Sequence, residues 1–178
     1  HCHHLVRDGE KMSKSRGNTL TVRDVLARTE NPAALRYLLL STHYRKQLNF
    51  TFEGLRQAEA ALERINVFAG AVKYGLYPDG ESQSVGKLVR DAEKAFSAGL
   101  ADDLNISVAM TAVFGLIKSV NTLISRGKLK KGDAAKLAAF IESIDRVLAV
   151  AEPKKHYRLD AEPGTYKPEG PGVGLTHT

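Results

Sequence analysis

The feature that most constrains this chain is a run of apolar residues between Ile106 and Ile124. The apolar side chains recur at intervals of three and four, which is the spacing of one face of an α-helix. Because a helix with an apolar face must pack that face against other elements, we expect a long helix in the core of a helical bundle. The residues expected to point inward are Ile106, Ala109, Met110, Val113, Leu116, Ile117, Val120, Leu123 and Ile124.

Further helices are predicted on both sides of this run. Asn31-Pro32 is a helix start, since a capping residue precedes Pro at the first helical position. The run that follows it is apolar nearly all round, as in a buried helix. The predicted fold is mostly α: a loop-bearing lead, then about six helices in a bundle. The expected N-caps are Thr21 (for a helix over 22–29), Asn31, Thr51 and Asp133.

The composition is that of a soluble globular protein. The chain has 178 residues and a single cysteine, Cys2, which fits a reducing, cytoplasmic compartment. No apolar run reaches the ~20 residues that span a bilayer. Because the chain opens on His1 rather than Met, we expect a piece of a larger protein. From residue 151 on, the Pro and Gly content predicts an irregular tail.

The positive charge is concentrated at the front of the chain. Residues 1–50 hold nine Lys/Arg against four Asp/Glu, a balance of +5, whereas residues 51–178 hold seventeen against sixteen, a balance of +1. A local cationic patch suggests a polyanion such as a nucleotide phosphate or a nucleic acid backbone. An ordinary solvated basic face is the alternative.

The stretch GEKMSKSRGN, residues 9–18, is the strongest candidate for chemistry. Lys11 and Lys14 are flexible point charges with three donors each, and Ser13 and Ser15 add neutral donors. Such a loop could fold over a triphosphate and stabilise charge that builds on leaving pyrophosphate. It is not a P-loop, because the spacing GxxxxGK[ST] is absent. A solvated basic loop is the other interpretation.

Residues 11–15 read KMSKS, the motif of class I aminoacyl-tRNA synthetases, and Gly17-Asn18 follows. The stretches TVRDVL (21–26), ALRYLLLSTHYR (34–45), LNF (48–50), ALERI (61–65) and DDLN (102–105) appear in the order found in cysteinyl-tRNA synthetases. The sequence from residue 1 to about residue 150 resembles this family. The resemblance implies a ligase that uses ATP to activate cysteine and then transfers it to tRNA(Cys).

The same resemblance implies roles for individual residues. Lys14 would contact the ATP phosphates, Lys11 would act beside it as the second catalytic lysine, and Met12, Ser13 and Ser15 would complete the ATP-binding loop. Mg²⁺ would accompany ATP, and zinc would be held by ligands upstream of this chain. The implied organisation is the tail of a Rossmann-type catalytic domain (1–30), stem-contact helices (31–74), a DALR-type tRNA-binding helical domain (85–150) and a tail (151–178). Alone, such a fragment is expected to be inactive.

Several other residues have competing interpretations. His1–His4 (HCHH) place only two candidate ligands on each face of a strand, which is too few for a zinc site, so no metal site is predicted. Arg45 and Lys46 either complement a helix dipole or contact tRNA phosphates. Asp102 and Asp103 are expected to cap or charge a helix start rather than act as a catalytic pair, with Asn105 as another cap candidate.

Three functional hypotheses follow. The first is part of a cytoplasmic, monomeric cysteine-tRNA ligase with no membrane partner. The second is a fragment of the related ligase that joins cysteine to an amino-sugar inositol in mycothiol synthesis, which would acylate the amine and not tRNA. The third is a non-catalytic, truncated paralogue that binds tRNA and would start with its own Met near residue 1.

Overall fold

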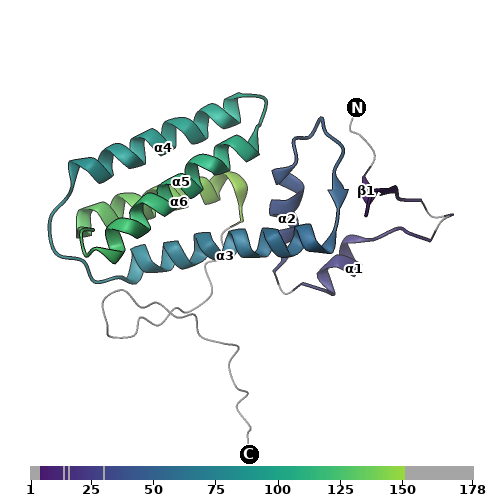
Figure 1. Ribbon diagram of the computed structural model, residues 1–178, viewed down its shortest axis with the longest axis horizontal. Helices are drawn as coiled ribbons and strands as arrows, with labels where there is room; N and C mark the ends of the chain where they lie inside the picture. The colour runs from purple at the N-terminus through teal and green to yellow at the C-terminus, as the bar shows by residue number, and fades with distance from the viewer. Residues whose placement is uncertain (1–4, 14, 16, 30, 151–178) are drawn as a thin grey trace, which may run out of the picture.

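The computed structural model describes residues 5–13, 15, 17–29 and 31–150. Two regions share one long helix (Figure 1). A small sheet with two helices lies at one end, and three long helices pack together at the other. The elements are β1 (Val6–Arg7), β2 (Glu10–Lys11), α1 (Val22–Leu26), α2 (Pro32–Ser41), β3 (Asn49–Phe50), α3 (Phe52–Tyr74), α4 (Gln83–Ala101), α5 (Ile106–Ser125) and α6 (Lys131–Leu148).

The sheet has the strand order β2-β1-β3. Strands β1 and β2 form an antiparallel hairpin whose turn is Asp8-Gly9, with φ of 50° and 83°. Positive φ at both turn positions is the geometry that Asp-Gly favours, because its twist matches that of the strands. Strand β3 pairs parallel with β1, and the Asn49 side chain accepts a hydrogen bond of 2.9 Å from the backbone N–H of Gly9. The hairpin is thus anchored to the segment that begins α3.

Helix α3 joins the two regions. It begins after Thr51, whose hydroxyl accepts the Gly54 N–H at 2.9 Å, and its 23 residues correspond to about 35 Å of helix. It packs against α2 near its start and against α5 and α6 farther along. A hydrogen bond also joins the two regions: Arg36 Nε of α2 donates to the backbone carbonyl of Leu148, at the end of α6, at 2.7 Å. The sheet region and the bundle are therefore joined by packing as well as by the chain.

The core of the bundle is the face of α5 that the sequence predicts. Seven of the nine expected residues are buried, from Ile106 to Val120, and Leu123 and Ile124 are partly buried against the same core. Asn105 is the N-cap of α5 and accepts the Val108 N–H at 3.3 Å. Among the described residues, α5 is the one helix long and apolar enough to cross a membrane by length and composition alone. Here it is packed against α4 and α3, as expected for a core helix of a bundle.

The starts of α4 and α6 are held together by one carboxylate. Asp133 is fully buried, and its two oxygens accept the backbone N–H of Ser82 at 2.8 Å and of Lys130 at 3.1 Å. Asp133 is therefore not the N-cap of the last helix, as the sequence analysis expected. The N-cap is Lys130, three residues earlier, so the helix begins at Lys131, and the Asp133 carboxylate links two loops that are distant in sequence.

Three other expectations differ from the structure. Helix α1 is shorter than the predicted 22–29, because the chain leaves the helix at Ala27. Helix α2 is not buried all round: Ala34 and Leu35 are enclosed, whereas Leu39 is 46% exposed. Lys11, expected in a loop, lies in β2 because the hairpin extends to it. The mostly α helical bundle is confirmed; the predicted tail lies outside the described residues.

Candidate functional site

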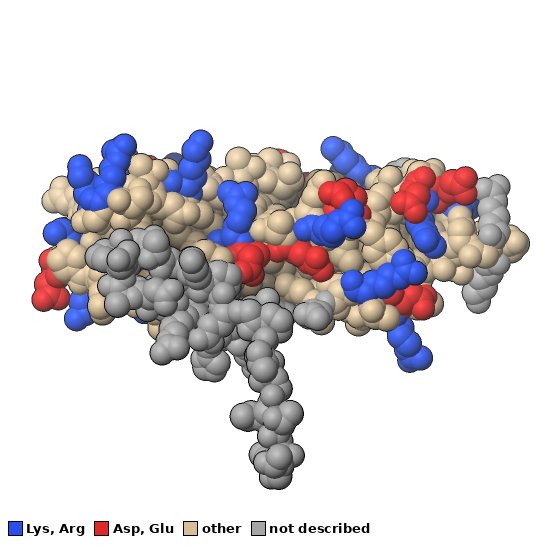
Figure 2. All heavy atoms as spheres, turned by 60° about the horizontal axis from the view of Figure 1, so that its bottom comes forward, with Lys and Arg blue, Asp and Glu red and all other residues tan. Residues whose placement is uncertain are grey.

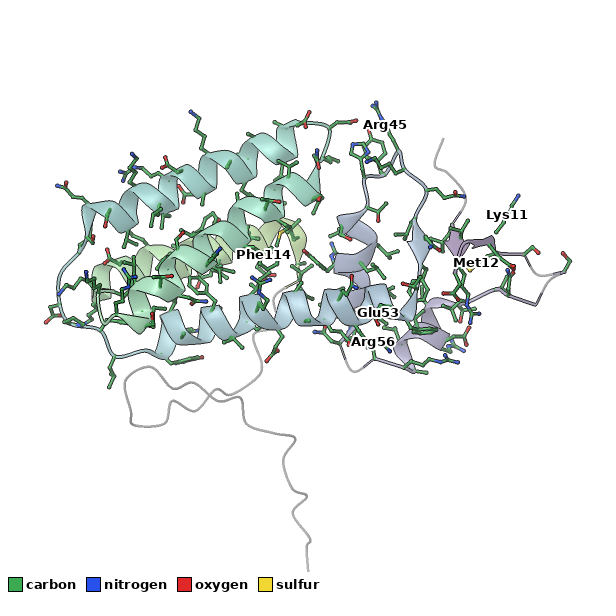
Figure 3. All side chains as sticks on the ribbon, viewed as in Figure 1. Lys11, Met12, Arg45, Glu53, Arg56 and Phe114 are labelled. Carbon is green, nitrogen blue, oxygen red and sulfur yellow. The ribbon has the colours of Figure 1, made fainter. Side chains whose placement is uncertain are left out.

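The predicted phosphate-binding loop leaves the sheet at the end of the β1–β2 hairpin. Lys11 is the last residue of β2 and its side chain is exposed, while Met12 and Ser13 are half-buried. Figure 3 shows Lys11 and Met12 at the outer edge of the sheet, beyond the helices. Ser15 is exposed, and its hydroxyl lies 3.3 Å from that of Ser13. Lys14 lies outside the described residues.

Asn18 closes this loop at its base. Its side-chain oxygen accepts the Ser13 N–H at 2.8 Å, and its side-chain nitrogen donates to the Lys11 carbonyl at 3.1 Å. Gly17, with a φ of 66°, makes the turn that brings Asn18 back to the strand. One amide thus joins both sides of the loop, and it contacts Lys11 through the backbone carbonyl, which leaves the Lys11 side chain outside that closure. The sequence analysis named Gly17-Asn18 as part of the motif but did not predict that Asn18 bridges the loop. The Gly-Asn pair was the signal that could have indicated it, because Gly and Asn favour turns and an Asn side chain can bond to nearby backbone.

The exit of the loop is fixed by a capping box at α1. Asp24 accepts the Thr21 backbone N–H at 2.8 Å and the Thr21 hydroxyl at 2.7 Å. The Thr21 hydroxyl in turn accepts the Asp24 N–H at 3.2 Å. The hydrogen bond from the Thr21 side chain, followed by that from its backbone, lowers the pKa of the Asp24 carboxyl from its ordinary value. Asp24 therefore stays ionised and occupied by the cap.

The side chains of this loop are suited to binding an anion. In the described part of the chain, Lys11 makes no ion pair, so its ammonium group is available to an anion. The hydroxyls of Ser13 and Ser15 lie close enough to contact the same oxyanion. Asn18 fixes the backbone at Lys11 and Ser13, so the donors on these two residues need less ordering before they stabilise developing negative charge.

Arg45, the other predicted contact, lies in a different environment. His43, Tyr44 and Arg45 follow the end of α2 and gather around Asp103, in the turn between α4 and α5. The Tyr44 hydroxyl donates to Asp103 Oδ1 at 2.5 Å, and Arg45 Nε lies 3.2 Å from Asp103 Oδ2. The hydrogen bond with Tyr44 and the charge of Asp103 raise the pKa of Arg45 further. Figure 3 shows Arg45 in the segment between α2 and β3, away from Lys11.

This cluster corrects the expectation for Asp103. Its backbone φ is 53° and its carboxylate contacts Tyr44 and Arg45, while Asn105 is the cap of α5. Asp103 instead links the two regions of the molecule through three side chains that lie about 60 residues earlier in the sequence. Lys46 is exposed, and its backbone N–H donates to the His43 carbonyl at 2.8 Å.

Metal ligation finds no support in the residues that the structure describes, where no group of three or more His, Cys, Asp or Glu could hold an ion. The sequence HCHH, residues 1–4, lies outside that part of the chain. The prediction that no metal is bound there remains a prediction.

Comparison with known proteins agrees with this geometry. A family model described as tRNA synthetases class I (C) catalytic domain matches residues 1–60, and a DALR domain model matches residues 95–152. The first match contains the hairpin, the Asn18-bridged loop, α1 and α2, and the second contains α5 and α6. The two regions of the fold thus match two different domain families, in this order.

Relatives named cysteine-tRNA ligase match most of the chain. The protein from Koribacter versatilis is 37% identical over 150 residues, which are 84% of this chain and 30% of the relative. The protein from Brachyspira hyodysenteriae is 41% identical over 152 residues, 83% of this chain and 31% of the relative. That from Chlamydia muridarum is 40% identical over 159 residues, 84% of this chain and 34% of the relative.

The chain spans about a third of the length of these curated relatives. The first domain match contains KMSKS and the Asn18 bridge, the second contains α5 and α6, and the relatives cover 83–84% of the chain. The chain belongs to the cysteinyl-tRNA synthetase family of class I synthetases.

Proposed function

We propose that this chain is the loop-bearing and helical part of a cysteine-tRNA ligase. The observation that carries the proposal is the KMSKS loop at the edge of the sheet, where Lys11 and Ser15 are exposed and Asn18 closes the base of the loop. In the proposed reaction the cysteine carboxylate attacks the α-phosphorus of ATP. The bond to the bridging oxygen breaks, and pyrophosphate leaves. A ribose hydroxyl of tRNA(Cys) then attacks the carbonyl carbon of the cysteinyl-adenylate, the bond from that carbon to the phosphate oxygen breaks, and AMP leaves.

Within that reaction the loop would bind the phosphates. Lys14 contacts them directly, Lys11 stabilises the leaving pyrophosphate beside it, and Met12, Ser13 and Ser15 form the rest of the contact surface. Each such contact could stabilise the transition state substantially, because one well-placed donor to a developing oxyanion lowers the activation free energy by about 3–4 kcal/mol. Mg²⁺ bound to ATP would share the charge. The zinc that the family resemblance implies finds no candidate ligand group among the described residues, and no step here depends on it.

The helical regions would bind tRNA. The proposed division is residues 1–30 for the end of the catalytic domain, 31–74 for the stem-contact helices, 85–150 for the DALR-type domain and 151–178 for the tail. Arg45 and Lys46 are the proposed contacts of the stem-contact region. The charge of Arg45 is shared with Asp103, so its contribution to RNA binding should be smaller than that of a free arginine. A cytoplasmic monomer is part of the same proposal.

The test is Lys14→Ala in the full-length protein. We expect ATP–pyrophosphate exchange to fall by more than about tenfold while cysteine binding is retained, since only the phosphate contact is removed. Lys118→Ala, at an exposed position of α5 outside the loop, is the matched control and should leave the exchange rate unchanged. Unchanged exchange in Lys14→Ala would remove this residue from the site. Acylation of an amino-sugar inositol in place of tRNA would overturn the assignment of the acceptor.

A further inference from the structure

A hollow of about 550 Å³ lies between the starts of α4 and α6, outside the KMSKS loop. Three cationic side chains, one carboxylate and neutral polar side chains line it, and its lining includes no aromatic or large aliphatic side chain. The side chains from α4 are Gln83, Ser84, Lys87 and Arg90; Glu81 comes from the preceding loop and Lys136 from α6.

Two of the cations converge over a glycine. Gly86 is buried in the lining, and a Cβ placed there would lie 3.4 Å from Arg90 Nη1 and 3.5 Å from Lys136 Nζ. Both charged groups therefore approach the same point on α4 from different helices. The absence of a side chain at Gly86 leaves room beneath them.

The positive charge of this hollow is only partly compensated. Lys136 pairs with Glu81, the single carboxylate in the lining. For Lys87 and Arg90, the described residues supply no ion-pair partner. Bringing like charges together costs free energy unless an anion lies between them, so the arrangement favours a bound anion.

The backbone of α4 adds to this preference. The Ser82 side chain makes no capping hydrogen bond in the described structure, and its hydroxyl instead lies 2.7 Å from that of Ser84. The N–H groups in the first turn of this 19-residue helix therefore have no capping bond from Ser82, and the positive end of the helix dipole lies beside Gln83 and Ser84 of the lining. Asp133 holds this helix start against α6 through Ser82, which keeps Lys136 and the α4 cations on one surface.

The row of cations extends along α4. Lys87, Arg90 and Lys94 are spaced three and four residues apart, which places them on one face of the helix, and all three are exposed. Figure 2 shows Lys and Arg side chains gathering along the upper edge of the end of the molecule that carries the bundle. A single small anion would occupy only the hollow, whereas a chain of phosphates could follow the row.

We propose that this hollow, with the row along α4, binds backbone phosphates of an RNA strand. The proposal rests on the proposed function, in which tRNA is the substrate. Lacking aromatic side chains to stack on a base, the site would read phosphate and not sequence. Its free cations distinguish it from Arg45, whose charge Asp103 already partners.

The experiment measures binding of the full 178-residue chain to a tRNA(Cys) transcript over a series of salt concentrations. The test variant is Lys87→Gln/Arg90→Gln, which leaves the Lys136–Glu81 pair in place. The matched control is Lys73→Gln/Lys118→Gln, which removes the same charge from exposed positions of α3 and α5 that do not line the hollow. Circular dichroism confirms that both variants fold, as expected for exposed side chains.

In the test variant we expect the affinity for tRNA at low salt to fall by roughly tenfold. The slope of log K against log salt should also be flatter by about 2, because about one counterion is released per phosphate contact and two contacts are removed. An unrelated tRNA should lose the same amount. If the unmutated chain binds tRNA and both double variants bind it equally well, the inference is wrong and the proposed function stands. If the unmutated chain binds no tRNA, the inference fails with the tRNA part of the proposed function.

A further arm separates the two sources of phosphate. Inorganic phosphate and pyrophosphate are titrated against the chain, with the α4 amides followed by NMR. One outcome is that millimolar phosphate shifts the α4 amide signals while Lys87→Gln/Arg90→Gln leaves tRNA binding unchanged. That outcome would identify a small-anion site and overturn the RNA assignment. Loss of tRNA binding in the test variant alone supports it.

Discussion

Replacing Asp133 with alanine should destabilise the bundle more than any other single acidic-to-alanine change in α6. The carboxylate is fully buried and accepts two backbone N–H groups, from Ser82 at 2.8 Å and from Lys130 at 3.1 Å. Hydrogen bonds to a charged group contribute about 1.5–3 kcal/mol each, and the donors left behind are partly shielded from water. Their loss therefore predicts a decrease of at least about 3 kcal/mol in the free energy of unfolding.

That decrease is large compared with the ~5–15 kcal/mol that stabilises a typical domain. For a chain of this size it corresponds to a fall in Tm of about 6–12 °C. Urea unfolding followed by circular dichroism measures it, with the m-value as a check that the same surface unfolds. Glu142→Ala is the matched control, since Glu142 lies on the same helix, carries the same charge and is exposed. A loss in Asp133→Ala no greater than in Glu142→Ala would refute the reasoning.

Two further predictions concern the KMSKS loop. In Asn18→Ala the Ser13 N–H loses its acceptor, so hydrogen exchange at this amide, measured by NMR, should accelerate by roughly tenfold or more. The control Thr19→Ala should leave the exchange rate of the Ser13 amide unchanged. Equal rates in the two variants would contradict the Asn18 bridge. In Thr21→Val the pKa of Asp24 should rise toward its ordinary value of 3.8, because the hydroxyl bond that lowers it is removed. Since the folded-state pKa is depressed, the capping contribution of Asp24 is present above 3.8 and is lost as pH falls through the folded value. An NMR titration of the carboxyl that shows no change would exclude Thr21 as the cause.

The helices could be predicted from sequence because their signals are local and repeated. The α5 stripe places an apolar residue at every turn, and Asn31 and Thr51 each cap the helix that follows within three residues. The family resemblance likewise depended on short contiguous stretches. These features require no knowledge of which elements pack together.

The features that were missed depend on contacts between distant segments. Strand β3 has two residues, too few to show a period, and its partner β1 lies more than 40 positions earlier. Asp133 reads as a helix cap until Ser82, 51 residues away, is placed beside it. The hollow between α4 and α6 has the same origin, since Arg90 and Lys136 converge only after the two helices pack.

Helix α3 has a consequence for how sequences of this kind can vary in length. Because its first part packs on α2 and its later part on α5 and α6, it fixes both the separation and the relative rotation of the KMSKS loop and the α4–α6 bundle. Inserting one residue in its middle would rotate everything beyond by about 100° and advance it by about 1.5 Å. Seven inserted residues would nearly restore the rotation but lengthen the spacing by about 10 Å. Relatives that place both regions on the same tRNA should therefore conserve the residue count of α3 and accommodate insertions in the loop over residues 75–82.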